Sequence, residues 1–326
     1  IPAASTEWSE ALRRIRPDIV CLGTPGTLRR PVIELAAELG CHLYCDKPLG
    51  TTAAEAVDYA RIAERGGIKH AYASTHRYDP SVAWMAELVQ DGAIGTLLEM
   101  EGTFRRHLPP LTPWTWYDTL ETGGGLLNNA FPHWLGILKS VTGGDLTRAM
   151  GESRIVRHKA PYVPDLHDFR DRGKHTPTAE EAERLEWREC DADNAFTALL
   201  RFSQSHHEIQ ATVSVTGAVA TWPANGWRLF GTEGTLIADG HYSYTVTRQR
   251  AAREERESLP APPRLLDALP SIGDEFENKW AALAREFVAD VRGEPHQLYL
   301  TFQDGACFQQ AIEAIRDGRG WTELHD

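Results

Sequence analysis

Two groups of polar residues in this sequence have the types and spacing needed to move a proton. The first is Asp46-Lys47-Pro48, which closes a short apolar run over residues 42–45. The second begins with three glycines at 123–125 and continues with Asn129 and His133, which are four residues apart and therefore share one face of a helix. Lysine stabilises negative charge on an oxygen, and histidine exchanges protons near neutral pH. We therefore expect proton transfer beside a bound cofactor.

The elements that must position the first group alternate between helix and strand over the first 92 residues. Continuous apolar runs predict strands over 18–22, 42–45 and 68–73. Amphipathic patterns predict helices between and after them, one of which opens with Thr52-x-x-Glu55, the pattern of a capping box. Such alternation predicts a parallel sheet with right-handed crossovers.

Polar, turn-forming residues follow each of these three predicted strands. They are Gly23-Thr24-Pro25-Gly26, Asp46-Lys47-Pro48 and Ser74-Thr75-His76-Arg77. The carboxyl ends of parallel strands lie along one edge of a sheet, where open α/β sheets bind ligands. We interpret the convergence as a ligand site, although turns are polar in any fold and a purely structural interpretation stays open.

After residue 95 the pattern changes to that of a second, largely antiparallel sheet. Apolar and alternating runs predict strands over 97–104, 195–202, 207–215, 227–230 and 234–237. The stretch 157–192 is rich in charge and proline and gives no clear pattern. Two predicted helices, over 276–291 and 303–317, close the chain. The length of 326 residues suits two domains.

Composition excludes several classes of partner and site. With 46 acidic and 34 basic residues the net charge is −12, which disfavours nucleic acid and anionic membranes as partners. No apolar run approaches the ~18 residues that a bilayer-spanning helix needs. Five scattered cysteines favour a reducing cytoplasm over a disulfide scaffold. The adjacent His206 and His207 would point to opposite faces of a strand, so we expect no metal site.

A series of short motifs resembles the Gfo/Idh/MocA family of nicotinamide-dependent oxidoreductases. The motifs are Gly-Thr-Pro at 23–25, Asp-Lys-Pro-Leu at 46–49, Arg-Tyr-Asp-Pro at 77–80, Gly-Ala-Ile-Gly at 92–95 and the triple glycine with a histidine eight residues on. The resemblance is strongest over residues 1–140. It implies an α/β fold, with a Rossmann-type parallel-sheet domain over 1–76 and an α+β domain with a large, mainly antiparallel open sheet over 77–326.

The same resemblance implies roles for single residues in binding NAD or NADP. Lys47 matches the family's lysine that touches both nicotinamide ribose and substrate, and Asp46 replaces the usual glutamate before it. Thr24 and Pro25 match residues that line the cofactor, and Arg77 matches an arginine near the nicotinamide.

On the substrate side, His133 matches the usual general acid/base, and Trp116 matches an aromatic position facing the site. Asn129 stands where the family has aspartate; it can hold a substrate hydroxyl but cannot stabilise a protonated His133 by charge. Pro132 is also unusual, and it fits only near the start of a helix.

The beginning of the sequence departs most from the family. A dinucleotide-binding domain opens with a strand, Gly-x-Gly-x-x-Gly and a helix, none of which is present. Ile1 falls where such a domain would already be roughly 60 residues long, about two βα units. Either this sequence lacks residues that the native protein has, which the absence of an initial methionine favours, or it is a truncated homologue.

The leading hypothesis is therefore an NAD(P)-dependent dehydrogenase or reductase, which transfers a hydride between the cofactor and a secondary hydroxyl or keto carbon of a sugar, inositol or related polyol. A second hypothesis is an NAD-dependent enzyme that cleaves glycosides through transient oxidation. A third is a truncated, non-catalytic homologue that acts as an assembly subunit. We expect a homodimer or homotetramer formed through an apolar face of the second sheet near Trp222 and Trp227.

Overall fold

The computed structural model describes residues 4–166, 168–204, 207–217, 219, 225–240 and 244–325. The chain forms two compact units, and each is described by itself. The first unit comprises Ile1–Tyr78 and Leu269–Gln310, and the second comprises Asp79–Ala268 and Ala311–His325. Among the described helices, none is long and apolar enough to cross a membrane.

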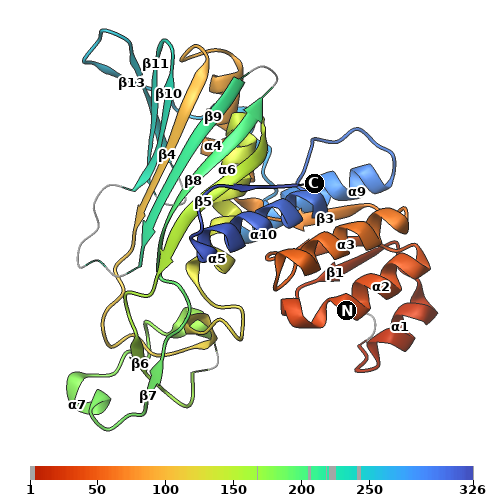
Figure 1. Ribbon diagram of the computed structural model, residues 1–326. Coiled ribbons are helices and arrows are strands. Elements are labelled where there is room, and N and C mark those ends of the chain that lie inside the picture. Colours follow the sequence, from red (N-terminus) through yellow and green to blue (C-terminus); the bar gives the residue numbers. More distant parts are fainter. Residues whose placement is uncertain are drawn as a thin grey trace. The chain divides into compact units, whose positions relative to one another are not determined.

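The core of the first unit is a parallel sheet with the strand order β1-β2-β3 (Figure 1). The strands are β1 (Ile19–Leu22), β2 (His42–Asp46) and β3 (His70–Ala73). Their register pairs Val20 with Leu43 and Leu43 with His70. The parallel sheet predicted from the alternating pattern is confirmed.

Helices and short turns precede, connect and follow these strands. They are α1 (Trp8–Ile15), the 3-10 turn η1 (Gly26–Leu28), α2 (Arg30–Leu39), α3 (Ala53–Arg65) and the 3-10 turn η2 (Thr75–Tyr78). Thr52 caps α3 by accepting the Glu55 N–H at 3.1 Å, as its sequence pattern predicts. The Glu55 carboxylate accepts the N–H of Thr51 rather than that of Thr52, so the capping box is shifted by one residue. Gly40 ends α2 with φ 72°, a left-handed conformation that favours glycine.

Two helices near the end of the chain contribute to the first unit, which ends at Gln310, within the second of these helices. Leu283 and Phe287 of α9 (Glu275–Val291) pack against Ala71 and Ala73 of β3. At the start of α10 (Phe302–Asp317) the ring of Phe302 stacks on His70 with centroids 4.7 Å apart. The sequence analysis placed both helices in the domain 77–326; residues 311–317 of α10 do belong to the second unit, whereas α9 and the start of α10 belong to the first. An amphipathic pattern predicts a helix but not the surface that the helix covers.

The second unit contains a sheet with the strand order β13-β12-β11-β10-β4-β9-β8-β5-β14. Its strands are β4 (Leu97–Arg105), β5 (Asp145–Arg154), β8 (Ala195–Gln204), β9 (His207–Thr216), β10 (Gly226–Gly231), β11 (Gly234–Asp239), β12 (Thr245–Arg250), β13 (Arg256–Ser258) and β14 (Thr322–Glu323). Among the described strands only β4 and β9 pair in parallel, so the mainly antiparallel sheet is confirmed. The sequence analysis missed β5, β12, β13 and β14, whose mixed composition lacks a clear alternation.

One face of this sheet is covered by helices α4 (Pro80–Gln90) and α6 (Phe131–Thr142), which pack against each other (Figure 1). Trp134 of α6 stacks on Phe104 of β4 with ring centroids 4.5 Å apart, and Trp227 meets Phe104 edge-on. A Cβ at Gly102 would lie 2.4 Å from the Trp227 ring, so only glycine fits there. Trp227 is fully buried, and its predicted place on an exposed apolar face is wrong; Trp222 lies outside the described residues.

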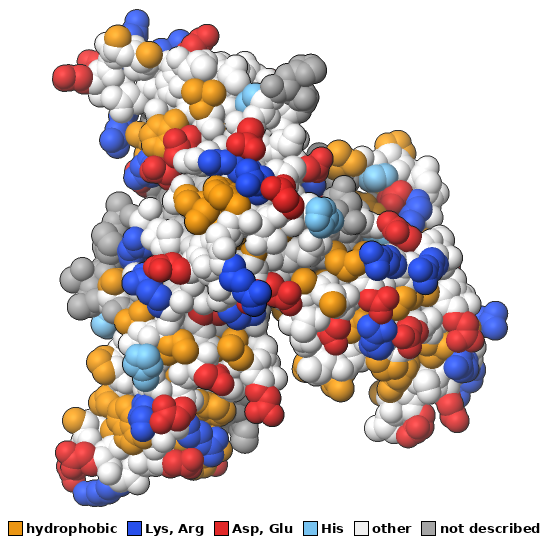
Figure 2. All heavy atoms as spheres, in the orientation of Figure 1, with side chains coloured by type: hydrophobic (Ala, Val, Ile, Leu, Met, Phe, Trp, Pro, Cys, Tyr) orange, Lys and Arg blue, Asp and Glu red, His pale blue; other side chains and the backbone are white. Residues whose placement is uncertain are grey.

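The other face of the sheet bears polar side chains. Arg201 donates to Gln210, and Gln210 donates to Glu99 at 2.8 Å, so the polar groups bond across three strands. Figure 2 shows acidic, basic and hydrophobic side chains interspersed on the visible surface. These polar contacts do not support the expectation that an apolar face of this sheet forms the subunit interface. The homodimer or homotetramer itself stays a prediction.

The stretch 157–192 forms a small lobe of the second unit. It contains the paired strands β6 (Lys159–Pro161) and β7 (Trp187–Glu189), the turn η4 (Phe169–Asp171) and the helix α7 (Ala179–Ala182). The guanidinium of Arg188 in β7 lies over the ring of Tyr162, the residue after β6, at 3.3 Å from the ring centroid.

Candidate functional site

In the first unit, the three predicted loops do meet at one edge of the sheet. The strands β1, β2 and β3 run parallel and end at Leu22, Asp46 and Ala73. Thr24 and Pro25 follow β1, Asp46 ends β2 and Lys47 follows it, and Arg77 lies on η2 shortly after β3. The structure thus brings together the segments predicted to bind a cofactor.

A buried arginine that the sequence analysis did not single out holds two of these loops. Arg29 is 3% exposed. Its Nε donates to the Thr24 carbonyl at 2.9 Å, and its Nη1 donates to the carbonyls of Asp46, at 2.6 Å, and Pro48. One guanidinium therefore joins the loop after β1 to the loop after β2. A lone arginine at the start of an apolar helix gives no signal of this role, because its partners lie up to 19 residues away.

Lys47 is half-buried at this edge. Burial lowers the pKa of Lys47; the Asp46 carboxylate opposes this shift, and the charge of Arg29 adds to it. Asp46 also accepts the backbone N–H of Lys47 at 2.9 Å, which orients the start of the turn. Such a lysine can donate a hydrogen bond and place a positive charge beside a substrate oxygen.

In the second unit, the triple glycine is required by a tight approach of backbone segments. A Cβ at Gly124 would lie 2.4 Å from the Tyr117 carbonyl oxygen, and Gly123 and Gly125 have φ of 84° and 95°. A Cβ at Gly125 would also lie 2.6 Å from the Asp193 carboxylate. Any other residue at these positions meets a clash or an unfavourable backbone conformation.

Asp193 anchors the helix that follows the glycines, α5 (Leu126–Asn129). Its backbone carbonyl accepts the Leu126 N–H at 3.0 Å, and its carboxylate accepts the Leu127 N–H at 2.8 Å. The residue is 4% exposed, and burial raises the pKa of Asp193, while the Leu127 N–H and the charge of Arg316 lower it. The sequence analysis missed Asp193, which is 68 residues or more from the glycines.

Asn129 and His133 do not lie on one continuous helix. Asn129 ends α5, and His133 is in the first turn of α6, with a break at Ala130 (φ −104°). The Asn129 amide nitrogen donates to the carbonyls of Gly123 and Gly125, each at 3.0 Å. Both of its N–H groups are thereby used, so Asn129 can serve a substrate only through its oxygen, as an acceptor.

Pro132 is in the first turn of α6, as its lack of an N–H predicts. Trp116 lies on the turn η3 (Trp116–Asp118) and is 37% exposed. Its ring meets those of Tyr117 and Phe169 at centroid distances of 5.7 and 5.2 Å. Trp116 therefore belongs to an aromatic cluster that includes the lobe residue Phe169.

The predicted site residues thus fall into two groups. Thr24, Pro25, Asp46, Lys47 and Arg77 belong to the first unit, and Trp116, Asn129 and His133 belong to the second. In neither group, nor elsewhere among the described residues, do three or more His, Cys, Asp or Glu side chains gather in a way that could hold a metal ion.

Comparison with known proteins agrees with this arrangement. Residues 1–73 match the family model described as "Oxidoreductase family, NAD-binding Rossmann fold", and residues 82–237 match that of the "GFO/IDH/MocA C-terminal domain". The chain belongs to the Gfo/Idh/MocA family. The predicted resemblance is therefore confirmed.

Curated relatives of this Gfo/Idh/MocA protein include two sugar dehydrogenases. It is 27% identical to levoglucosan dehydrogenase of Pseudarthrobacter phenanthrenivorans over 143 residues. This matched segment covers 43% of this chain and 37% of that protein. It is 27% identical over 146 residues to D-xylose dehydrogenase of Paenarthrobacter nicotinovorans, or 42% and 38% of the two chains. The matched segments thus span less than half of either relative.

Solved structures share the fold over almost the whole chain. An NAD-binding oxidoreductase from Klebsiella pneumoniae superposes with a TM-score of 0.78 at 22% identity, covering 99% of this chain and 84% of that one. A levoglucosan dehydrogenase in complex with NADH and levoglucosan gives a TM-score of 0.77 at 19% identity, with the same two coverages. At these identities the likeness shows the fold alone.

Proposed function

We propose that this protein is an NAD(P)-dependent oxidoreductase, which transfers a hydride between the nicotinamide cofactor and a secondary hydroxyl or keto carbon of a sugar or related polyol. The observation that carries the proposal is the convergence of three polar loops, with a half-buried Lys47, at the carboxyl edge of a parallel sheet. The family model over residues 1–73 and the two sugar dehydrogenases among the relatives support it.

The residues present fit the nicotinamide side of such a cofactor. The Arg29 and Asp46 contacts orient the loops that carry Thr24, Pro25 and Lys47. Arg77, on η2 after β3, contributes a second cation at the same edge of the sheet. When bound, the nicotinamide accepts or supplies the hydride. No Gly-x-Gly-x-x-Gly occurs in this sequence, so we assign no residue to the pyrophosphate.

The protein's own residues would handle the substrate and its proton. Lys47 would donate a hydrogen bond to the reacting hydroxyl and stabilise negative charge on its oxygen as the proton leaves. His133 would take that proton as general base, or supply it in the reverse direction. Asn129 would accept a hydrogen bond from a substrate hydroxyl through its oxygen, since its nitrogen is bonded to the glycine turn. Trp116 would contact the apolar face of the sugar ring.

The test is turnover of levoglucosan and D-xylose with NAD and with NADP, followed by absorbance of the reduced cofactor. His133→Ala should lower turnover by ~10²–10⁴-fold, the usual contribution of a positioned general acid/base. Cofactor affinity should not change. The matched control is His158→Ala, which removes an exposed histidine of the small lobe and should leave turnover unchanged.

Two outcomes would contradict the proposal. Full activity of His133→Ala would mean that the proton leaves by another route. Release of an alcohol from a glycoside with no net change in the cofactor would instead indicate cleavage through transient oxidation.

A further inference from the structure

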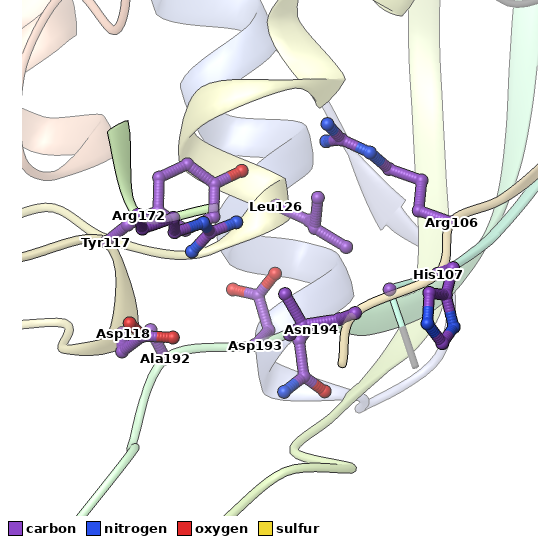
Figure 3. Close-up of a pocket in the computed structure, with 11 residues that line it drawn as sticks. Arg106, His107, Tyr117, Asp118, Leu126, Arg172, Ala192, Asp193 and Asn194 are labelled. Carbon is purple, nitrogen blue, oxygen red and sulfur yellow. The ribbon is translucent and has the colours of Figure 1, made fainter. Parts of the chain in front are cut away.

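The second unit contains an open pocket whose lining includes two arginines and two aspartates. Arg106, from the loop after β4, and Arg172, from the loop after η4, line it together with Tyr117 and Leu126 (Figure 3). In this view the Arg172 guanidinium lies to the left of Leu126 and the Arg106 guanidinium lies above it.

Neither of these guanidinium groups is neutralised by the protein. Among the described residues, no carboxylate or carbonyl oxygen lies within hydrogen-bond or ion-pair distance of the side chain of Arg106 or Arg172. The Nη1 atom of Arg172 is buried and has no hydrogen-bond partner in the described part of the chain. Its guanidinium lies 5.4 Å from the centre of the Tyr117 ring, which holds it against the pocket wall.

The acidic residues of the pocket are engaged elsewhere. Asp118 forms an ion pair with Arg157 at 2.5 Å, where the two side chains are 8% and 10% exposed, and it caps η3. Asp193 accepts the Leu127 N–H and lies 3.5 Å from Arg316. These contacts use the negative charge of both carboxylates, and two arginines remain unmatched.

The pKa of Arg172 also reflects a positive charge that the protein does not fully balance. Burial lowers the pKa of Arg172, the charges of Arg157 and Arg106 lower it further, and Asp118 and Tyr117 oppose the shift. A buried polar group that makes no hydrogen bond costs free energy, and the cost is larger for a charged one. An anion in the pocket would remove this cost, and the planar fork of an arginine matches the geometry of a carboxylate or phosphate.

We propose that this pocket binds the oxyanion group, carboxylate or phosphate, of a small molecule through Arg172 and Arg106. Leu126, which lines the pocket, begins α5, and Asn129, about 5 Å further along the helix axis, ends it. Resting on the proposed function, this makes the substrate an acidic sugar rather than a neutral one. Tyr117 and Leu126 supply the apolar wall that a sugar ring needs.

The experiment is calorimetric titration of the full chain, without any dinucleotide, with D-glucuronate, D-glucose 6-phosphate and neutral D-glucose. At least one of the two anions should bind 10-fold or more tightly than glucose. Arg172→Gln and Arg106→Gln should each weaken that anion about 10- to 100-fold, the usual effect of losing a charged hydrogen bond. Neither variant should change glucose binding. Arg184→Gln, an exposed arginine of the same lobe paired with Glu180, is the matched control and should bind like the parent.

The anion that binds more tightly distinguishes a sugar acid from a sugar phosphate. If neither anion binds more tightly than glucose, or if binding survives both substitutions, the proposal is wrong. Thermal melting of each variant checks folding, and Arg106→Gln decides the question if Arg172→Gln does not fold. Because the titrations contain no cofactor, anion binding without redox activity would refute the proposed function alone, and redox activity on neutral sugars without anion binding would refute this inference alone.

Discussion

Arg29 should contribute more to the free energy of unfolding than any exposed ion pair of the first unit. It is 3% exposed and donates to the carbonyls of Thr24, Asp46 and Pro48. Arg29→Met fills much of the same volume but leaves these carbonyls without their donor. At about 1.5–3 kcal/mol for each hydrogen bond from a charged group, losing two of them costs roughly 3–6 kcal/mol. That is a large part of the 5–15 kcal/mol that stabilises a typical domain.

The assay is urea unfolding followed by circular dichroism, with the free energy of unfolding taken from the midpoint and slope. Arg30→Met is the matched control, since Arg30 is the next residue in the chain and pairs with Glu34 and Asp58 at the surface, where its side chain is 42% exposed. Its midpoint should hardly move, because exposed ion pairs contribute little.

Arg29→Lys separates charge from geometry. Lysine keeps the positive charge but lacks the fork that reaches two loops at once, so its stability should fall between those of the parent and Arg29→Met. Arg29→Met should also weaken binding of the nicotinamide cofactor, because the loops bearing Thr24 and Lys47 lose their common anchor. Equal midpoints for Arg29→Met and Arg30→Met would refute the reasoning.

Three further predictions follow from the site. Lys47→Met should stabilise the first unit and abolish turnover. Folding lowers the pKa of Lys47, so the unfolded chain binds more protons than the folded one. The parent's free energy of unfolding should therefore rise with pH up to about 10.5, the ordinary pKa of lysine. The urea midpoint measured against pH should therefore rise less steeply in the variant, and an unchanged slope would contradict this. Asn129→Asp should destabilise the glycine turn, because a carboxylate replaces the amide donor that faces the carbonyls of Gly123 and Gly125. The variant should melt at a lower temperature than the parent, and an equal melting temperature would contradict this prediction. Light scattering at micromolar concentration should give the mass of a dimer or tetramer, and a monomer at every concentration would reject the expected oligomer.

The signals that predicted structure correctly are local ones. Apolar runs of four to six residues with helical patterns between them predicted β1, β2 and β3, because strand and helix periods are visible within a dozen residues. Thr52 and Pro132 marked helix starts, since capping and the missing proline N–H act within one turn. The turns at the strand ends predicted that Thr24, Lys47 and Arg77 share an edge, because parallel strands all end on the same side.

Contacts between distant segments were decided only by the tertiary structure. The sequence shows Trp227 as an aromatic residue in a strand, but which face of the sheet it occupies depends on the packing of Phe104 and Trp134. The amphipathic pattern of α9 shows an apolar stripe, but not that the stripe covers β3.

The same holds for the charged groups that support the site. Arg29 and Asp193 look like ordinary polar residues in sequence, and their importance arises from backbone groups that folding brings to them. Arg106 and Arg172 become an anion-binding pair only because Asp118 is already held by Arg157. Residue types and local periods determine which elements form and where turns present polar groups. Burial and charge pairing depend on which distant residues become neighbours, so only the folded chain determines them.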